Sequence, residues 1–244
     1  MKRNTFFIIS LVLFGALIIF YRPEILFSPY KDRESLPTQL FSAEKPFWRI
    51  ENSSGFFELS SLKLVEEDKE KNFLLYEPLF KSFVQGNTQS SASSVSASLH
   101  LPEESLIMRN NVHLTVSETE DKIDLFTDSL SVNLKNKTYS SDNKVMVKNS
   151  SLNLISSGFS ITTNSSGIGK EISFDNAHFV NNETENKFQG KADLIIYRSP
   201  SEILSMKGSA EVNINSSIIT AEEIEFNFKT KKIISSKKSK IIKS

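Results

Sequence analysis

Apolar and polar residues alternate along much of this chain after residue 46, with a period of two. In the stretch 128–147, "DSLSVNLKNKTYSSDNKVMV", the apolar positions are Leu130, Val132 and Leu134, and the intervening positions are polar. A turn follows at 135–137, and the alternation resumes at Val145 and Val147. Because successive side chains of a strand point to opposite faces, this pattern predicts two half-buried strands joined by a turn.

The same unit recurs along the chain at spacings near 30 residues. Turn residues such as Pro102, Asn110-Asn111, Asp142-Asn143 and Pro200 separate the units. The inward sets predicted for the other units are Leu62 and Leu64; Val95, Ala97, Leu99 and Leu101; Val112, Leu114 and Val116; Leu152 and Leu154; Phe159 and Ile161; Ala192, Leu194 and Ile196; Val212 and Ile214; and Ile224, Phe226 and Phe228.

No segment beyond residue 28 has a sustained helical period, so the pattern predicts an all-β fold of stacked hairpins. One hairpin buries too little apolar surface to be stable alone, and neighbouring hairpins must therefore stack into a continuous interior.

The N-terminus carries a different pattern. Residues 6–21 contain no charge, and only Ser10 and Gly15 among them are neither apolar nor aromatic. A helix of this length spans about 24 Å, somewhat less than the roughly 30 Å of a bilayer core, and the flanking Lys2, Arg3 and Arg22 can reach the interfaces. The excess of positive charge before the segment predicts a cytoplasmic N-terminus and export of the remaining chain. A cleaved signal peptide is the alternative, although no Ala-x-Ala site follows the apolar run.

The amino-acid composition argues against several kinds of functional site. The chain has 244 residues, no cysteine, and 29 acidic against 29 Lys and Arg side chains, so its charge gives no indication of nucleic-acid binding. The three histidines, His100, His113 and His178, fall on different predicted strands, so no metal site is expected. No nucleophile elbow, phosphate loop or paired-carboxylate motif occurs, and we therefore expect no enzymatic activity and no cofactor.

The stretches "SVSASLHLPEESLIMRNNVHLTV" and "LFTDSLSVNLKNKTYSSDNKVMVKNSSLNLISSGFSI" carry a resemblance to a known family. Together with the short apolar N-terminus, these stretches resemble the LptC family, the membrane-anchored periplasmic components of lipopolysaccharide export. The shared features, in order, are an Asn before a Val, a Thr-Asp strand, a Ser-Ser step at Ser140-Ser141 and a Ser-Gly-Phe step at 157–159. After residue 184, "GKADLIIY" and "LSMKGSAEVNINSSIITAEEIEFNF" resemble the repeat of LptA, the soluble bridge protein of the same pathway.

This resemblance implies an open β-jellyroll that is preceded in the sequence by one N-terminal transmembrane helix. The expected divisions are an anchor at 1–27, a linker at 28–48, an LptC-like jellyroll at 49–182 and an LptA-like extension at 183–244. It also implies non-enzymatic transfer of lipopolysaccharide from an inner-membrane ABC transporter to a periplasmic LptA-like bridge, with the bulk of the chain in the periplasm. The alternative function is a membrane-anchored structural or adhesive β-solenoid that binds no lipid.

The resemblance assigns two sets of site residues. The residues expected to line a groove for acyl chains are Leu99, Leu101, Leu114, Leu130, Val132, Leu134, Phe159 and Ile161, and for any one of them ordinary core packing is the alternative. The residues expected at the partner-docking end are Gly158, Ile224, Phe226 and Phe228. At Gly158 a close approach of two backbones is expected, and a bulge or turn glycine is the alternative.

The C-terminal segment after Glu225 has many lysines and no acidic residue. These lysines could contact lipid phosphates or an acidic partner edge, or they could protect exposed strands from incorrect pairing. The sequence leaves both interpretations open.

Overall fold

The computed structural model describes one compact unit within Leu40–Ser244. The described residues are 41–52, 55–66, 71–118, 121–149, 152–163, 170–181, 188–199, 201, 203–214, 217–227, 230 and 232–243. Within these ranges every regular element is a strand, which confirms the prediction of an all-β fold. None of these residues belongs to a helix long and apolar enough to cross a membrane, and the anchor predicted at 1–27 lies outside the described ranges.

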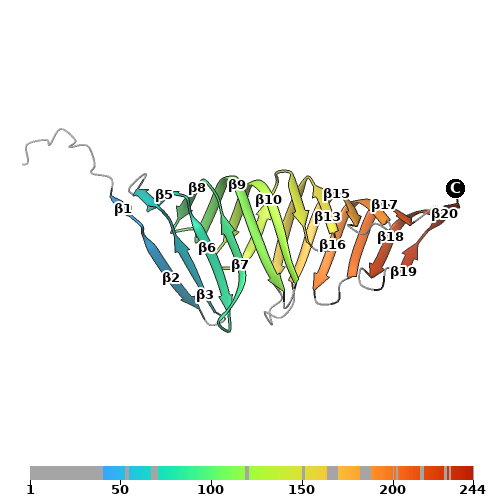
Figure 1. The fold of residues 1–244 in the computed structure, drawn as a ribbon, viewed down its shortest axis with the longest axis horizontal. Coiled ribbons are helices and arrows are strands. Elements are labelled where there is room, and N and C mark those ends of the chain that lie inside the picture. The colour runs from blue at the N-terminus through green and yellow to red at the C-terminus, as the bar shows by residue number, and fades with distance from the viewer. Residues whose placement is uncertain are drawn as a thin grey trace, which may run out of the picture. The chain divides into compact units, whose positions relative to one another are not determined.

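The strands form one antiparallel network that folds along a crease into two facing layers (Figure 1). Layer A contains β1 (Ser42–Glu44), β4 (Lys63–Glu66), β5 (Asn72–Tyr76), β8 (Ser96–His100), β11 (Thr138–Ser141), β14 (Gly158–Thr163) and β19 (Lys232–Lys237). Layer B contains β2 (Phe47–Asn52), β3 (Gly55–Ser60), β6 (Leu79–Val84), β7 (Asn87–Ser93), β12 (Val145–Lys148), β13 (Leu152–Ser156) and β20 (Lys240–Lys243).

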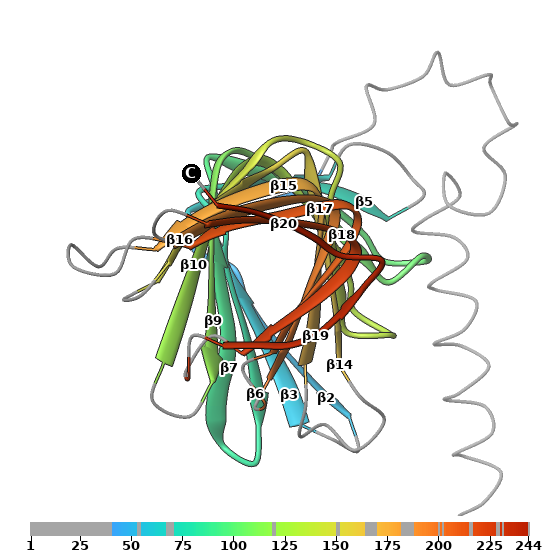
Figure 2. The same cartoon turned by 90° about the vertical axis from the view of Figure 1, so that its right-hand side faces the viewer.

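Longer strands cross the crease and belong to both layers. They are β9 (Ser105–Glu118), β10 (Asp121–Asn133), β15 (Lys170–Asn181), β16 (Phe188–Ser199), β17 (Ile203–Ile214) and β18 (Ser217–Asn227). The first half of β9 pairs with β8 in layer A, and its second half pairs with β7 in layer B. Figure 2, the view along the stack, shows β7 on one side of the interior and β14 on the other.

The crease is built from residues that accept left-handed backbone angles. In β9, Asn110 and Asn111 have φ values of 65° and 54°, and the register with β10 shifts opposite Asp128. In β17, Gly208 and Ser209 have φ values of 71° and 47°, and the register with β18 shifts there as well. Asn and Gly tolerate this region better than other residues, and an extra residue on one strand bends it. The turn signal seen in the sequence at Asn110-Asn111 is therefore a bend within one strand.

Near the N-terminal end, separate short strands meet at the crease, and backbone hydrogen bonds continue across it. Leu62 N donates to Tyr76 O at 2.9 Å, Glu77 N donates to Val95 O at 2.9 Å, and Val95 N donates to Asn110 O at 3.0 Å. These positions explain two errors in the predicted inward sets. Leu62 and Val95 are 51% and 50% exposed because they lie on the crease, where strand alternation is interrupted.

The predicted division at residues 182–183 falls between β15 and β16. These strands pair from Lys170–Ser199 to Val180–Gln189, so the residues after 183 continue both layers of the same unit. At the other end, β1 and the start of β2 lie inside the segment predicted as linker, so the strands begin earlier than expected.

A substitution at Gly208 tests the packing at the crease, since this residue has a positive φ and little space for a Cβ atom. A Cβ built on Gly208 would lie 2.5 Å from Asp193 Oδ2, whereas Gly86, with φ 80°, has nothing within 4 Å of that position. We expect Gly208→Ala to lower the free energy of unfolding by about 2–3 kcal/mol and Gly86→Ala by only about 1 kcal/mol. Chemical denaturation followed by circular dichroism measures both. Equal losses for the two variants would contradict the packing assigned to the crease.

Candidate functional site

The interior between the two layers is the candidate site, and it consists of apolar rows that cross successive strands. In layer A one row runs through Leu99, Leu106, Val132, Tyr139, Ile161, Ile172, Tyr197, Leu204, Phe226 and Ile233, each in register with the next. In layer B a row runs through Trp48, Leu59, Phe80, Ala92, Leu114, Leu125, Val147, Leu154, Phe179, Gly190, Val212, Ile219 and Ile241. The buried members of these rows belong to one hydrophobic cluster that extends from Phe57 to Phe226.

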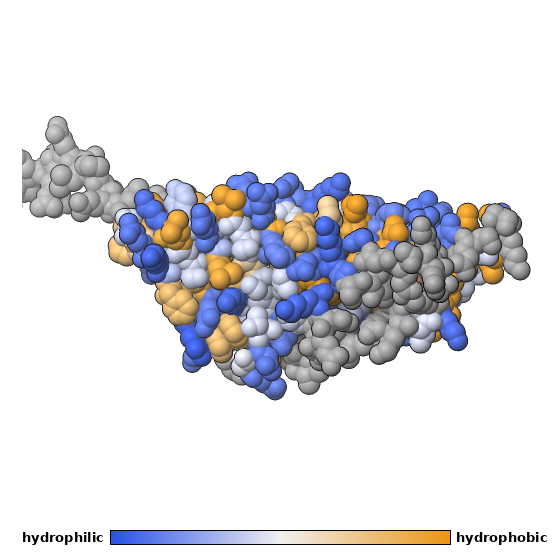
Figure 3. All heavy atoms as spheres, viewed as in Figure 1, coloured by the Kyte–Doolittle hydropathy of each residue, from blue (hydrophilic) through white to orange (hydrophobic). Residues whose placement is uncertain are grey.

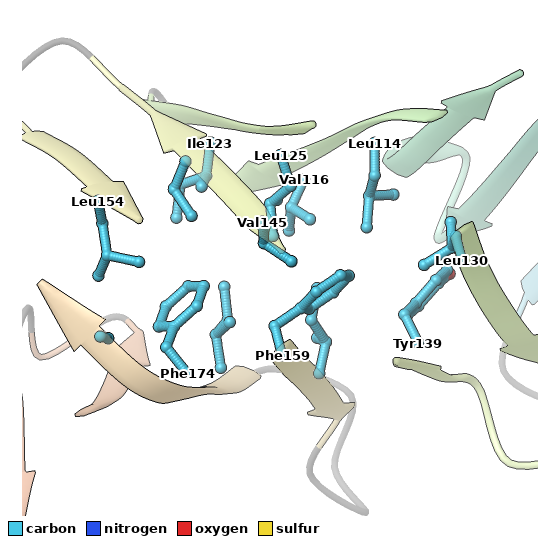
Figure 4. Close-up of a cluster of buried hydrophobic side chains, with 14 of the residues drawn as sticks. Leu114, Val116, Ile123, Leu125, Leu130, Tyr139, Val145, Leu154, Phe159 and Phe174 are labelled. Carbon is cyan, nitrogen blue, oxygen red and sulfur yellow. The ribbon is translucent and has the colours of Figure 1, made fainter. Parts of the chain in front are cut away.

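Side chains of the two layers meet in the middle of this interior. Figure 4 shows Leu114, Leu125 and Val145 of layer B facing Leu130 and Phe159 of layer A. The facing surfaces contain leucine, valine and phenylalanine with few polar groups, so contact energy is spread along the interior instead of being concentrated at one point.

Seven of the predicted groove residues lie in this interior and are at most 8% exposed: Leu99, Leu114, Leu130, Val132, Leu134, Phe159 and Ile161. The inward orientation predicted for Leu101 is wrong, because Leu101 is 40% exposed in the turn at 101–104 that joins β8 to β9. Strand alternation ends at His100, and a prediction that extends the period into the turn places Leu101 on the wrong side.

The predicted docking residues lie away from the free edges of the network. Gly158 is buried on β14, between β11 and β15, and a Cβ there would lie 2.8 Å from Ser141 O. The close backbone approach expected at Gly158 is therefore present, but it belongs to the crease.

Ile224 and Phe226 are fully buried on β18, which pairs with β17 on one side and with β19 and β20 on the other. Phe228 lies outside the described residues. The alternating run in the sequence ends at Phe228 and the lysine-rich segment after it lacks a clear period, so the sequence pattern does not indicate β19 and β20.

The free edges are formed by β1 and β2 at one end and by β19 and β20 at the other. Inner-row residues are uncovered at both ends: Ile50 of β2 is 42% exposed and Ile241 of β20 is 61% exposed. On the face shown in Figure 3, hydrophobic residues lie among hydrophilic ones over the length of the unit, including near β20. The interior rows therefore reach both ends without a covering element among the described residues.

Polar contacts cross between the layers on the side opposite the crease. Tyr139 of layer A lies 2.8 Å from Ser90 Oγ and 3.2 Å from Ser82 Oγ of layer B, and the two serines are 2.7 Å apart. Burial raises the pKa of the Tyr139 hydroxyl, and the hydrogen bonds to the serines offset part of that effect. The phenol is therefore protonated at neutral pH and able to donate.

Two lysines of layer A also reach across. Lys170 Nζ donates to Gln89 O at 3.0 Å and to Ser117 O at 3.3 Å. Lys137 Nζ lies 5.8 Å from the centre of the Phe57 ring, and burial lowers the pKa of Lys137. None of these contacts was predicted from the sequence. The available signal was a tyrosine inside a Ser/Thr-rich strand, but the partner strand across the interior cannot be found from a period of two.

The histidines have separate partners. His100 Nδ1 lies 2.7 Å from Asn72 Oδ1, and His113 Nε2 lies 2.8 Å from Asp124 Oδ1. Among the described residues, no three His, Asp or Glu side chains are grouped so that they could hold a metal ion.

Comparison with known proteins gives a family match. No curated protein matches the chain. A solved structure, the periplasmic LptA homologue LptH of the lipopolysaccharide transport device of Pseudomonas aeruginosa, is similar with a TM-score of 0.46 and 12% identity, over 50% of this chain and 94% of LptH. The family described as "Lipopolysaccharide-assembly, LptC-related" matches residues 8–168, about two thirds of the sequence. This match shows that the chain belongs to the LptC-related family of lipopolysaccharide-assembly proteins.

Proposed function

We propose that this protein is a non-enzymatic carrier that receives lipopolysaccharide from an inner-membrane ABC transporter and passes it to a periplasmic bridge protein. The acyl chains would lie between layers A and B, in contact with Leu130, Val132 and Phe159. The observation that carries this proposal is the row of layer B that runs from Trp48 of β2 to Ile241 of β20, together with the uncovered inner residues Ile50 and Ile241 at the two ends. Family membership supports lipopolysaccharide as the lipid.

The chemistry of the interior suits transient binding. Each buried methylene of an acyl chain contributes about 0.8 kcal/mol through the hydrophobic effect, without a defined orientation. A carrier must release its lipid to the next protein, and many weak apolar contacts can be exchanged one at a time. A few strong polar bonds would hold the lipid at one position.

In this proposal the architecture is an open β-jellyroll, and residues 1–27 anchor it in the inner membrane with the N-terminus in the cytoplasm. The ABC transporter would contact the anchor. The unpaired edge at β19 and β20 would receive an LptA-like bridge by strand addition, so that the partner's strands continue the rows ending at Ile233 and Ile241. Lysines 232, 237, 238 and 240 lie on or beside this edge and would discourage pairing with other edges.

A structural β-solenoid that binds no lipid is the second candidate. The burial of seven predicted groove residues favours it, because their side chains pack against the opposite layer and cover one another. The two functions differ in whether the interior opens.

Photo-crosslinking distinguishes these functions. A photoreactive residue at Phe159, which points into the interior, should form adducts with lipopolysaccharide, whereas one at the neighbouring Ser160, which is exposed on the outer face, should not. The measurement is a mobility shift detected with antibody to lipopolysaccharide, using the full chain in its membrane. Equal labelling at both positions, or none at Phe159, would favour the structural β-solenoid.

The two edges can be compared in the same way. A photoreactive residue at Ile241 should crosslink to the LptA-like bridge protein, and one at Ile50 at the opposite edge should not, because the proposed docking uses β19 and β20. Crosslinks from Ile50 alone would place the bridge at the N-terminal edge and refute this part of the proposal.

A further inference from the structure

Three buried hydroxyl groups lie together in the otherwise apolar interior, on the side opposite the crease. Ser82 of β6 and Ser90 of β7 pair with each other in layer B, in a row whose neighbouring members are Phe57 and Val116. Tyr139 of layer A reaches both serines across the interior. All three residues are buried, so their hydroxyl groups depend on one another for hydrogen bonds.

The three hydroxyl groups form a closed ring of hydrogen bonds. Ser82 Oγ lies 2.7 Å from Ser90 Oγ, and the Tyr139 hydroxyl lies 2.8 Å from Ser90 Oγ and donates to Ser82 Oγ at 3.2 Å. Because each hydroxyl has a single proton, Ser82 then donates to Ser90, and Ser90 donates to Tyr139. Burial raises the pKa of the Tyr139 hydroxyl, so the phenol keeps its proton at neutral pH. Within the described part of the chain these hydroxyl groups make no other hydrogen bond, and each oxygen keeps one further acceptor site.

Such a ring can be enlarged by one more hydroxyl group. A hydroxyl that enters between Tyr139 and a serine accepts one hydrogen bond and donates one, so every member of the ring again has two partners. A methylene group at the same place would leave two buried polar groups unpaired, which is costly. An ester carbonyl can only accept, and it would interrupt the ring. The ring therefore favours a ligand group that both donates and accepts a hydrogen bond.

The position of the ring determines which part of a lipid it would meet. Phe80 and Ala92, which belong to the apolar row of layer B, lie on the crease side of the two serines. The turns at 85–86 and 134–137 lie on the other side, where their residues are largely exposed. An acyl chain whose tail lies along the apolar row would have its carboxyl end near these turns. A hydroxyl group that reaches the ring must therefore lie within the first few carbons of the chain.

We propose that Ser82, Ser90 and Tyr139 form a polar subsite of the groove, which binds a hydroxyl group carried by an acyl chain near its carboxyl end. The hydroxyl enters the ring between Tyr139 and the serines, so the two layers move apart there and remain bridged by hydrogen bonds through the ligand. An acyl chain without such a group binds without this bridge. This inference rests on the lipid-carrier function proposed above and adds to it a selectivity among acyl chains.

Competition between matched fatty acids tests the subsite. The probes are tetradecanoic acid, 3-hydroxytetradecanoic acid and 12-hydroxytetradecanoic acid, whose hydroxyl group would lie among the apolar rows. Displacement of a fluorescent fatty acid from the full chain in detergent measures the affinity of each. We expect the 3-hydroxy acid to bind about fivefold more tightly than tetradecanoic acid, which is the contribution of about one neutral hydrogen bond. The 12-hydroxy acid should bind no more tightly than tetradecanoic acid.

Variants of the ring separate a binding role from a structural one. Ser90→Ala and Tyr139→Phe each remove one hydroxyl group and should reduce the fivefold preference for the 3-hydroxy acid to less than about twofold. The control Ser91→Ala changes the next residue of β7, which points to the outer face, and should keep the full preference. Because the ring variants also change how easily the layers separate, the readout is the ratio of the two affinities. A ratio that stayed at its native value in both ring variants would overturn the subsite.

The results for the native chain separate the subsite from the carrier function. Equal binding of tetradecanoic acid and its 3-hydroxy form would show that water completes the ring, and it would overturn the subsite while the carrier function stands. An equal gain for the 12-hydroxy acid would overturn the position assigned to the hydroxyl. If N-tetradecanoylglycine were preferred over its ester analogue while the 3-hydroxy acid had no advantage, the ligand group would be an amide and the hydroxyl assignment would be wrong. Failure of every probe to bind would contradict the subsite and the proposed function together.

Discussion

The structure depends on the need of each layer to cover the apolar face of the other. Most of the described strands have one largely apolar and one largely polar face, and no layer alone could keep its inner row from water. The crease satisfies this need along the whole unit, because positive-φ residues such as Asn110, Asn111 and Gly208 turn a strand from one layer into the other within two or three residues. The same bend, repeated strand after strand, produces rows instead of a closed globular core.

An interior built of rows can be lengthened at its ends, unlike a closed globular core. Each added pair of strands lengthens the interior, and each end remains, within the described part of the chain, an unpaired edge with uncovered inner side chains. A second β unit with the same geometry can extend both the hydrogen-bond ladder and the apolar rows in one step. The proposed transfer of lipid between proteins follows from this continuity, since acyl chains would meet similar surroundings on both sides of the junction.

Much of the fold could be predicted from the period of two. The alternation identified Leu130, Val132, Leu134 and Phe159 as inward-facing, and the absence of a helical period indicated an all-β fold. Errors occurred where the period is interrupted. Leu62 and Val95 lie on the crease and Leu101 lies in a turn. Near Asp193 the crease shifts the inward positions, so that Ile195 is fully buried and Leu194 is only half-buried.

The contacts between layers could not be predicted, because they join residues distant in sequence. Tyr139 and Ser82 are 57 residues apart, and Lys170 and Gln89 are 81 residues apart. Local patterns carry no information on which strand lies opposite which across the interior. The strands at the C-terminal edge could not be predicted for a related reason, since β19 and β20 are recognisable as strands only through their pairing with β18.

The most direct measurement is an experimental structure of the full chain bound to lipopolysaccharide. We expect acyl-chain density between layers A and B in contact with Leu130 and Phe159, with Tyr139 and Ser90 further apart than the 2.8 Å between their hydroxyl oxygens in the present structure. Lipid density confined to the outer faces, with the interior still packed as it is here, would contradict it.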